Sequence, residues 1–245
     1  MTRKVQKLIR KIWFLVSGMF WYKLSLIRYL RLRGKLGVQS KLRYWPILGD
    51  RDPESHTFDK HYIYMNRWAA KLIFAVKPIK HVDVGSQIAF LSMVSIEVPT
   101  EFVDIRPVSL GFDNFTTKEG SILHLPYQDN SLQSVSCLHV AEHIGLGRYG
   151  DPLDPLGTVK ACKELVRVLS PNGKLYFALP VGKSREYFNA HRIHSPSIIL
   201  DYFKELTLQS FSVVNDAGEY ITGADPQTFE GADYACGMFE FTKPA

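Results

Sequence analysis

The sequence predicts an α/β fold: an open, doubly wound sheet of about seven strands, mostly parallel with an antiparallel last strand, preceded by an N-terminal amphipathic helix. After the first 60 residues, short runs of β-branched residues alternate with runs of helical periodicity, which is the pattern of βαβ units. The length of 245 residues, 46% of them hydrophobic, suffices for one substantial core. The first 49 residues hold twelve Lys and Arg and no Asp or Glu, whereas the remainder has 18 basic and 24 acidic residues. We therefore expect a basic segment and connector over residues 1–49 and a folded domain over residues 50–245.

The N-terminal segment has the composition of a helix that lies in a membrane interface. Its apolar residues recur at helical spacing between lysines and arginines, and Trp13 and Trp21 lie near the ends of the uncharged run 12–22. This run is too short for a spanning helix, which needs about 20 apolar residues, and no signal-cleavage pattern follows it. We expect residues 1–34 to bind an anionic membrane surface and the protein to be cytoplasmic and peripheral on the inner face of the membrane. Packing of the helix on the body or on a partner is the alternative; no nucleic-acid partner is expected, because no reader motif follows.

The body can be divided into elements from its periodicity and its breakers. A helix is expected over residues 61–76, because Lys77 and Pro78 end the apolar repeat. Strands are expected over residues 80–84, 101–104, 134–137 and 174–180, with a helix over 157–169 that a turn at 170–173 closes. A helix over 196–205, a strand over 206–214 and a last, antiparallel strand over 234–242 complete the order. The three cysteines are far apart and form no CxxC pair, which predicts neither a disulfide framework nor a zinc knuckle.

The ends of the first two strands carry the residues expected at a ligand site. Ligands of open parallel sheets bind beyond the carboxyl ends of the strands. The first strand ends in Asp83 and Gly85, and the second ends in Asp104, at about the 20-residue spacing from which a carboxylate accepts hydrogen bonds from ribose hydroxyls. Instead of binding a ribose, Asp104 could pair with Arg106 or cap a turn.

Residues 81–90 and 120–147 resemble the corresponding stretches of class I S-adenosylmethionine-dependent methyltransferases. In the glycine loop of that superfamily, acidic-x-Gly-x-Gly-x-Gly, Asp83 and Gly85 match, whereas Gln87 and Ala89 replace the later glycines. The second stretch matches at Leu125, Pro126, Asp129, Asn130, Ser131, Glu142 and His143. The resemblance implies a Rossmann-like fold and S-adenosylmethionine as the cofactor. The cofactor-binding residues it implies are Asp83, Gly85, Ser86, Asp104, Ser121, Ile122 and His139.

A closer similarity covers more of the chain. Residues 61–70, 81–86, 103–107, 141–151, 188–196 and 234–243 resemble a methyltransferase-like family, domain of unknown function 268, whose members are often associated with surface polysaccharide biosynthesis. That resemblance implies O-methylation of a sugar or glycan-lipid intermediate, with a small-molecule or lipid-linked glycan as the acceptor. The rival is a non-catalytic methyltransferase-like module that docks on a membrane enzyme or binds a glycan. Cofactor binding separates the two.

Polar residues after the later strands are the candidates for the acceptor side. Transfer to a hydroxyl needs a group that removes its proton, and a histidine suits this task. The candidate bases are His143, His191 and His194, and the candidate substrate-binding residues are Glu142, Arg148, Tyr149, Asp151 and Arg192. Alternatively, Arg148 and Arg192 bridge Asp151 or Glu142 and hold the loops together.

One motif at these loops points to a different chemistry. His139, Glu142 and His143 spell H-x-x-E-H, which on a helix is a zinc-hydrolase signature. Because the run follows a parallel strand and the helix pattern soon breaks, no metal is expected.

Overall fold

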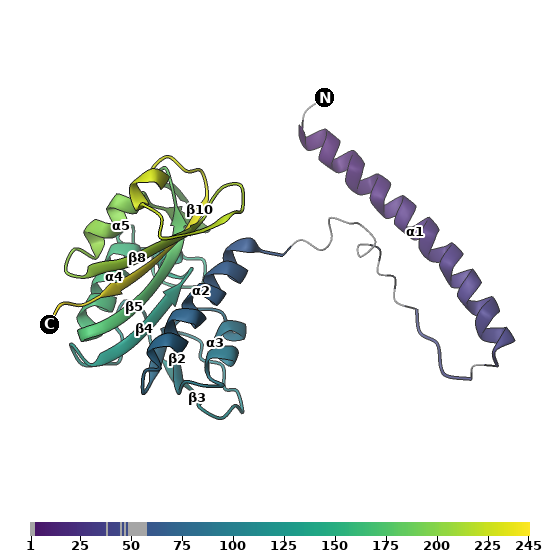
Figure 1. Ribbon diagram of the computed structural model, residues 1–245. Helices are drawn as coiled ribbons and strands as arrows, with labels where there is room; N and C mark the ends of the chain where they lie inside the picture. The colour runs from purple at the N-terminus through teal and green to yellow at the C-terminus, as the bar shows by residue number, and fades with distance from the viewer. Residues whose placement is uncertain (1–2, 38, 45, 47, 49–57) are drawn as a thin grey trace. The chain divides into compact units, whose positions relative to one another are not determined.

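The computed structural model describes residues 3–37, 39–44, 46, 48 and 58–245 (Figure 1). The chain forms two compact units, Met1–Phe58 and Asp59–Ala245. The domain boundary predicted after residue 49 falls among residues 49–57, which lie outside the described residues.

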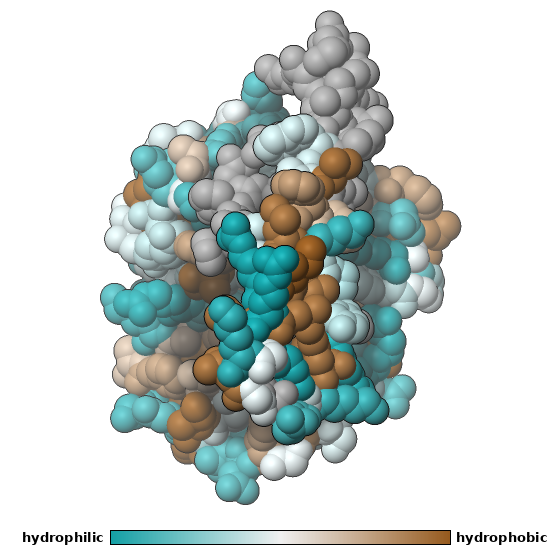
Figure 2. All heavy atoms as spheres, turned by 90° about the vertical axis from the view of Figure 1, so that its right-hand side faces the viewer, coloured by the Kyte–Doolittle hydropathy of each residue, from teal (hydrophilic) through white to brown (hydrophobic). Residues whose placement is uncertain are grey.

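The first unit contains α1 (Arg3–Lys35), a single helix of 33 residues, which confirms the predicted N-terminal helix. Exposed apolar side chains recur every three or four residues along it, at Trp13, Val16, Phe20, Leu24 and Ile27. This repeat places them on one face. Figure 2 shows the result as a band of brown side chains flanked by teal ones. Among the described residues, no helix has both the length and the apolar character needed to cross a membrane.

The second unit begins with α2 (Lys60–Val76), one residue before the predicted start. Asp59 caps it, because its side chain accepts hydrogen bonds from the backbone N–H groups of His61 and Tyr62. The helix ends at Lys77, whose φ of 48° is left-handed.

A sheet of eight strands forms the centre of this unit, in the order β3-β2-β1-β4-β5-β10-β8-β9. The strands β1 (His81–Val84), β2 (Thr100–Asp104), β3 (Phe115–Glu119), β4 (Leu132–Leu138) and β5 (Leu169–Val181) are parallel. β10 (Ala235–Thr242) runs antiparallel between β5 and β8 (Thr207–Val214), as the sequence predicts for the last strand. β9 (Tyr220–Thr222) pairs with β8 at the edge, and β6 (Arg185–Tyr187) and β7 (His191–Ile193) form a separate hairpin.

Helices cover both faces of the sheet, which is the doubly wound arrangement. On one face α2 and α3 (Ile88–Val94) pack against Tyr176 and Ala178 of β5. The neighbouring residues Leu175, Phe177 and Leu179 point to the other core, which α4 (Gly157–Val168) and α5 (Pro196–Tyr202) cover. Because residues 175–181 of β5 are buried on both faces, this half of the strand is a continuous apolar run.

Three details differ from the expected elements. The sheet has eight strands, and two of them, β3 and β9, were not expected. Both lie at the edges of the sheet, where polar residues such as those of FTTKE weaken the strand pattern in the sequence. The turn expected at residues 170–173 is instead a bulge within β5, with Asn172 at a φ of 61° and a register shift against β4. The helix expected over residues 196–205 ends at Tyr202.

Candidate functional site

The strand order reverses between β1 and β4, and the loops that follow β1, β2 and β4 surround a cavity of about 600 Å³. We call this space the sheet-end cavity. It lies where ligands of doubly wound sheets bind, and its volume is within the range of small-molecule sites. The predicted cofactor residues that line it are Gly85, Asp104, Ser121, Ile122 and His139.

Asp83 and Ser86 lie behind this cavity instead of lining it. The Asp83 carboxylate accepts a hydrogen bond from the Ser86 backbone N–H at 2.9 Å and a short one from the Ser136 hydroxyl. The Ser86 hydroxyl accepts from the Leu138 backbone N–H at 3.0 Å. These bonds tie the loop after β1 to the end of β4. The two residues therefore hold the shape of the cavity from outside.

A buried polar network continues from Asp83 into the sheet. The two ring nitrogens of His81 each lie 2.8 Å from a serine hydroxyl, Nδ1 from Ser134 and Nε2 from Ser136. Because Ser136 donates its proton to Asp83, Nε2 of His81 donates to Ser136. Burial lowers the pKa of His81 to about 3 and raises the pKa of Asp83 to about 6, although hydrogen bonds from Ser136 and Ser86 oppose the second shift.

Gly85 is required by both its conformation and its surroundings. Its φ of 73° lies in the left-handed region, and an added Cβ would lie 2.9 Å from Cγ1 of Val140. The backbone after β1 thus approaches the start of the loop after β4 closely. Any larger residue here would push the two loops apart and change the shape of the sheet-end cavity.

Asp104 divides its two oxygens between the loop and the cavity. Oδ1 accepts a hydrogen bond from the Arg106 backbone N–H at 2.7 Å, which is the turn-capping role considered from the sequence. Oδ2 lies 3.8 Å from the position that a Cβ on Gly85 would occupy. The turn therefore fixes the carboxylate and leaves the second oxygen beside the glycine loop.

Gln87, which replaces a glycine of the methyltransferase pattern, points away from this space. Its side-chain oxygen accepts a hydrogen bond from the Asn66 side chain of α2 at 3.2 Å. Gln87 is the residue before α3 and does not line the sheet-end cavity. The substitution therefore leaves the cavity open.

A second cavity of about 330 Å³ adjoins the first, and we call it the histidine cavity. Three residues, His139, His143 and Tyr149, line both cavities. The remaining lining residues of the histidine cavity are Asp59, His61, Tyr62, Glu142, Arg148, His191 and Tyr234.

Glu142 is the most unusual group in the histidine cavity. Its side chain is fully buried, and neither of its oxygens has a hydrogen-bond partner among the residues that the structure describes. Oε1 lies 3.4 Å from Nδ1 of His139 and 3.6 Å from Nε2 of His143. Burial raises the pKa of Glu142 to about 8 and lowers the pKa of His139 to about 3. The carboxylate lies within 4 Å of two imidazole nitrogens and forms a hydrogen bond with neither.

His143 is oriented by a backbone carbonyl. Its Nδ1 lies 2.6 Å from the carbonyl oxygen of Ala190, so Nδ1 carries the hydrogen and Nε2 has a free lone pair. The ring packs edge-on against Tyr149 and His191. Burial lowers the pKa of His143 to about 4, which keeps the ring neutral. A neutral imidazole with one free nitrogen is the form that accepts a proton.

The other two candidate bases lie in different surroundings. His191, in β7, lines the histidine cavity between the rings of Tyr187 and Tyr234, each 5.3 Å away. Burial, followed by the charges of Arg148 and Arg185, lowers its pKa. His194 packs against Tyr202 of α5, and within the described part of the chain it lines neither cavity.

The predicted substrate-binding residues divide in the same way. Arg148 and Tyr149 line the histidine cavity, with the guanidinium 5.2 Å from the centre of the Tyr149 ring. Arg192 is buried and holds loops together: it pairs with Glu186 at 2.5 Å and donates to the backbone oxygen of Ile144 at 2.6 Å.

Asp151 also braces a loop, although it lines the sheet-end cavity. Its two oxygens accept from the backbone N–H groups of Gly145 and Tyr149. Arg192 therefore holds loops together, as the alternative expected, although its carboxylate partner is Glu186 and not Asp151 or Glu142.

The H-x-x-E-H run does not lie on an α-helix. Ala141–His143 is a single 3₁₀ turn, and His139 lies before it with a left-handed φ of 56°. The two histidines therefore share no helix face.

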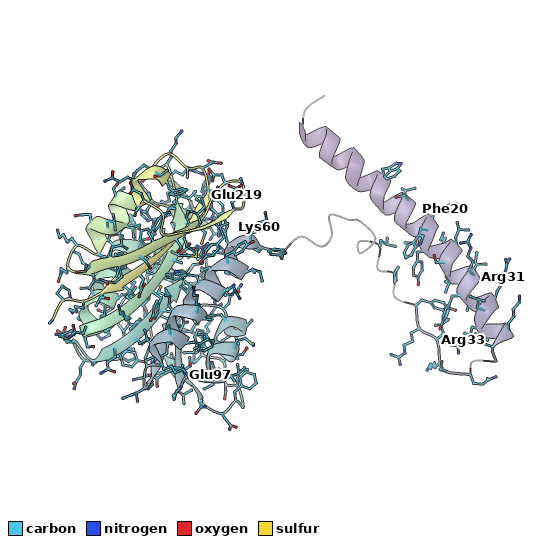
Figure 3. All side chains as sticks on the ribbon, viewed as in Figure 1. Phe20, Arg31, Arg33, Lys60, Glu97 and Glu219 are labelled. Atoms are coloured by element: carbon cyan, nitrogen blue, oxygen red, sulfur yellow. The ribbon has the colours of Figure 1, made fainter. Side chains whose placement is uncertain are left out.

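Several lining residues are not among the predicted site residues, although they lie in the stretches 61–70 and 234–243 that carry the family resemblance. His61 and Tyr62 belong to the first turn of α2, and Figure 3 shows the adjacent Lys60 beside Glu219 of the β8–β9 turn. β8 has the same direction as β5, so that turn lies at the carboxyl edge of the sheet. Tyr234 precedes β10, whose antiparallel direction brings its beginning to the same edge. Only the topology brings these residues to the site.

Two comparisons concern the sequence. A family model described as "Caenorhabditis protein of unknown function, DUF268" matches residues 76–214. A curated relative, an uncharacterized protein of Methanocaldococcus jannaschii, is 34% identical over 86 residues, which are 34% of this chain and 33% of the relative. The chain thus matches about a third of that relative's length.

Solved structures show a similar fold at low identity. N-methyltransferase NodS of Bradyrhizobium japonicum, in complex with S-adenosyl-L-homocysteine, is 14% identical with a TM-score of 0.53 over 80% of this chain and 93% of its own. The 1,6-didemethyltoxoflavin-N1-methyltransferase of Burkholderia thailandensis, with S-adenosylhomocysteine bound, is 12% identical with a TM-score of 0.51 over 74% and 79%. The [4+2]-cyclase SpnF is 14% identical with a TM-score of 0.56 over 94% and 95%. The fold is therefore the Rossmann-like fold of class I methyltransferases, and the cyclase among these proteins shows that the fold does not name the reaction.

Proposed function

The chain belongs to the family described as "Caenorhabditis protein of unknown function, DUF268", and from its fold and its two adjoining cavities we propose that it is an S-adenosylmethionine-dependent methyltransferase. The observation that carries the proposal is the wall that the cavities share. A donor in the sheet-end cavity and an acceptor in the histidine cavity would meet at His139, His143 and Tyr149. Holding two reactants in one orientation supplies much of the rate of such a transfer.

The sheet-end cavity has the features that the cofactor needs. Gly85 has no side chain where the backbone must approach a ligand, and Asp104 keeps Oδ2 beside that glycine. Ser121 and Ile122 line the cavity from the loop after β3. NodS and the toxoflavin methyltransferase, which share this fold, were solved with S-adenosylhomocysteine. When bound, S-adenosylmethionine supplies a methyl group on a sulfonium for transfer to a nucleophile.

The histidine cavity supplies the groups that act on the acceptor. Nε2 of His143 takes the proton of an acceptor hydroxyl, because Nδ1 is already committed to Ala190. Arg148 offers a cation to an anionic part of the acceptor, and the rings of Tyr62, Tyr149 and Tyr234 offer flat, partly polar surfaces. These groups fit a sugar or glycan-lipid intermediate that carries phosphate. The setting in surface polysaccharide biosynthesis rests on the family resemblance of the sequence.

Calorimetric titration with S-adenosylhomocysteine tests the proposal. We expect saturable binding by the wild type, at least tenfold weaker binding by Asp104→Ala, and unchanged binding by Asp113→Ala, whose exposed carboxylate lies outside the sheet-end cavity. No heat at millimolar ligand would contradict the proposal and favour a non-catalytic module that binds a glycan or docks on a membrane enzyme. Equal affinity in Asp104→Ala would contradict the assigned site.

We also propose that residues 1–34 hold the protein on the cytoplasmic face of an anionic membrane, as a peripheral protein. The exposed apolar side chains of α1 supply the surface that enters the lipid, and its basic residues meet the headgroups. Figure 3 shows Phe20, Arg31 and Arg33 along the C-terminal half of this helix. A variant that lacks residues 1–36 should no longer sediment with anionic vesicles. Equal sedimentation would contradict this role and favour packing of the helix on a protein surface.

A further inference from the structure

Three potential metal ligands meet beside the histidine cavity. They come from segments far apart in the chain: His61 from the start of α2, His139 from the end of β4 and Cys236 from the second position of β10. One ligand atom from each, two imidazole nitrogens and a thiol sulfur, lies within 4.8 Å of the others. We propose that these three side chains bind a zinc-class divalent metal ion.

The distances suit such an ion. Nε2 of His139 lies 3.2 Å from Sγ of Cys236. Bonds of about 2.1 Å to nitrogen and about 2.3 Å to sulfur, at a tetrahedral angle, separate the two ligand atoms by about 3.6 Å. Small side-chain rotations therefore convert the observed contact into shared coordination. Nitrogen and sulfur ligands select zinc over magnesium and calcium, which prefer oxygen.

Glu142 supplies an independent observation at the same place. A histidine that binds metal through one nitrogen almost always donates its other N–H to a carboxylate or carbonyl. Nδ1 of His139 lies 3.4 Å from Oε1 of Glu142, and Nε2 faces Cys236. The Glu142 oxygens are buried without a hydrogen-bond partner in the described part of the chain. A buried carboxylate is costly without a compensating positive charge, which the ion would provide.

Three protein ligands leave one position of a tetrahedral ion open. His61 and His139 both line the histidine cavity, so this position would be reached from that cavity. Binding releases one proton, because the Cys236 thiol must become a thiolate. The site stands without the methyltransferase proposal, although an acceptor oxygen is the natural occupant of the open position if both hold.

The sequence predicts no metal, because the H-x-x-E-H run follows a parallel strand and its helix pattern soon breaks. The proposed ligands lie far apart in the chain and follow no spacing pattern of known metal sites. Of the H-x-x-E-H run, His139 alone becomes a ligand, and Glu142 orients it. His143 is held by Ala190 instead. The proposed site is therefore unrelated to the helical zinc-hydrolase motif.

Metal titration of the untagged, chelator-treated full chain tests the proposal. We expect one equivalent of zinc to bind with micromolar or tighter affinity. Cobalt(II) should give the near-ultraviolet thiolate charge-transfer band and the intense visible bands of a tetrahedral site. Cys236→Ala should remove the charge-transfer band, whereas Cys162→Ala, which removes a buried thiol of α4, should keep it.

A second pair of variants keeps the test independent of the buried cysteine. His61→Gln should weaken zinc binding at least tenfold, whereas His124→Gln, at an exposed histidine elsewhere, should leave it unchanged. Glu142→Gln should weaken binding by about 10- to 100-fold, the usual effect of losing such a carboxylate. The proposal would be overturned if the folded wild type did not bind zinc. It would also be overturned if His61→Gln and Cys236→Ala bound zinc as tightly as the wild type. Because no cofactor or acceptor takes part, either result leaves the proposed function to its own test.

Discussion

The two adjoining cavities are built by different means. The sheet-end cavity is formed by short runs of residues at the ends of β1, β2, β3 and β4, where Gly85, the Asp104 turn and the Asp83–Ser86 bonds fix the backbone. The histidine cavity is formed by side chains from α2, β7, the loop after β4 and the residue before β10. The first therefore depends on local backbone geometry and the second on the assembled sheet. The proposed cofactor cavity is therefore encoded in short runs at the strand ends, whereas the proposed acceptor cavity depends on side chains that only the topology brings together.

The largest effect is expected from His143→Gln, which removes the proposed general base from the wall that the two cavities share. Removing a general base usually costs about 10² to 10⁴ in rate, so turnover should fall by that factor while S-adenosylhomocysteine affinity stays the same. The measurement is methyl transfer to sugar nucleotides or lipid-linked glycans. The matched control is His194→Gln, because His194 packs against Tyr202 outside both cavities and should keep its turnover. Full turnover in His143→Gln with a lower melting temperature would assign His143 a structural role.

The next effect tests whether Asp83 braces the sheet-end cavity as a buried acid. Its pKa rises from 3.8 to about 6 on folding, so the folded state holds a proton that the unfolded state has lost between these values. The free energy of unfolding of the wild type, relative to Asp83→Asn, should therefore fall as the pH rises from 4 to 6, by about 3 kcal/mol at most. Denaturant titrations across this range measure the difference, and His81 is present in both proteins. A difference that stays constant with pH, or rises, would contradict the buried position of Asp83.

A smaller effect is expected from Gly85→Ala, which changes the backbone of the sheet-end cavity. The left-handed φ and the contact with Val140 should together cost about 2 kcal/mol of stability and weaken S-adenosylhomocysteine binding. Gly111→Ala is the control, because an added Cβ there meets nothing within 4 Å. Equal melting temperatures and affinities in the two variants would show that the close approach at Gly85 is not needed.

The smallest effect concerns the binding of α1 to a membrane. Phe20 of α1 is 66% exposed, and Phe20→Ser should weaken binding to anionic vesicles by at least about tenfold, since a buried aromatic ring contributes about 1.5 to 3 kcal/mol. Ile63→Ser, at an exposed apolar residue of α2, is the control. Binding should also weaken with salt, because the basic residues of α1 act through screened charge. Equal loss in both variants would mean that α1 is not the membrane contact.

The sequence alone predicts most of what is continuous along the chain. The order of β1, β2, β4, β5, β8 and β10, the antiparallel insertion of β10 and the contribution of Gly85 and Asp104 to a cavity at the strand ends follow from periodicity, breakers and spacing. It does not predict β3, whose polar residues suit a sheet edge, or the bulge in β5, where one residue adopts a left-handed φ without ending the strand.

The histidine cavity shows most clearly which site residues the sequence does not predict. His143, Arg148 and His191 were predicted because they follow strands, whereas His61 and Tyr234 come from a helix start and from the loop before an antiparallel strand. Arg192 and Asp151 have the charge of ligand-binding residues, yet their bonds to loop backbone atoms give them bracing contacts. A residue type indicates what a side chain can do, and only its neighbours decide which of these it does.

We expect the two cavities to form one site, with their shared wall between donor and acceptor. A crystal structure of the full chain with S-adenosylhomocysteine tests it directly. We expect density in the sheet-end cavity, with the ribose beside Asp104 and the sulfur directed at the wall formed by His139, His143 and Tyr149. Ligand density elsewhere on the fold, or a sulfur directed away from these three side chains, would contradict it.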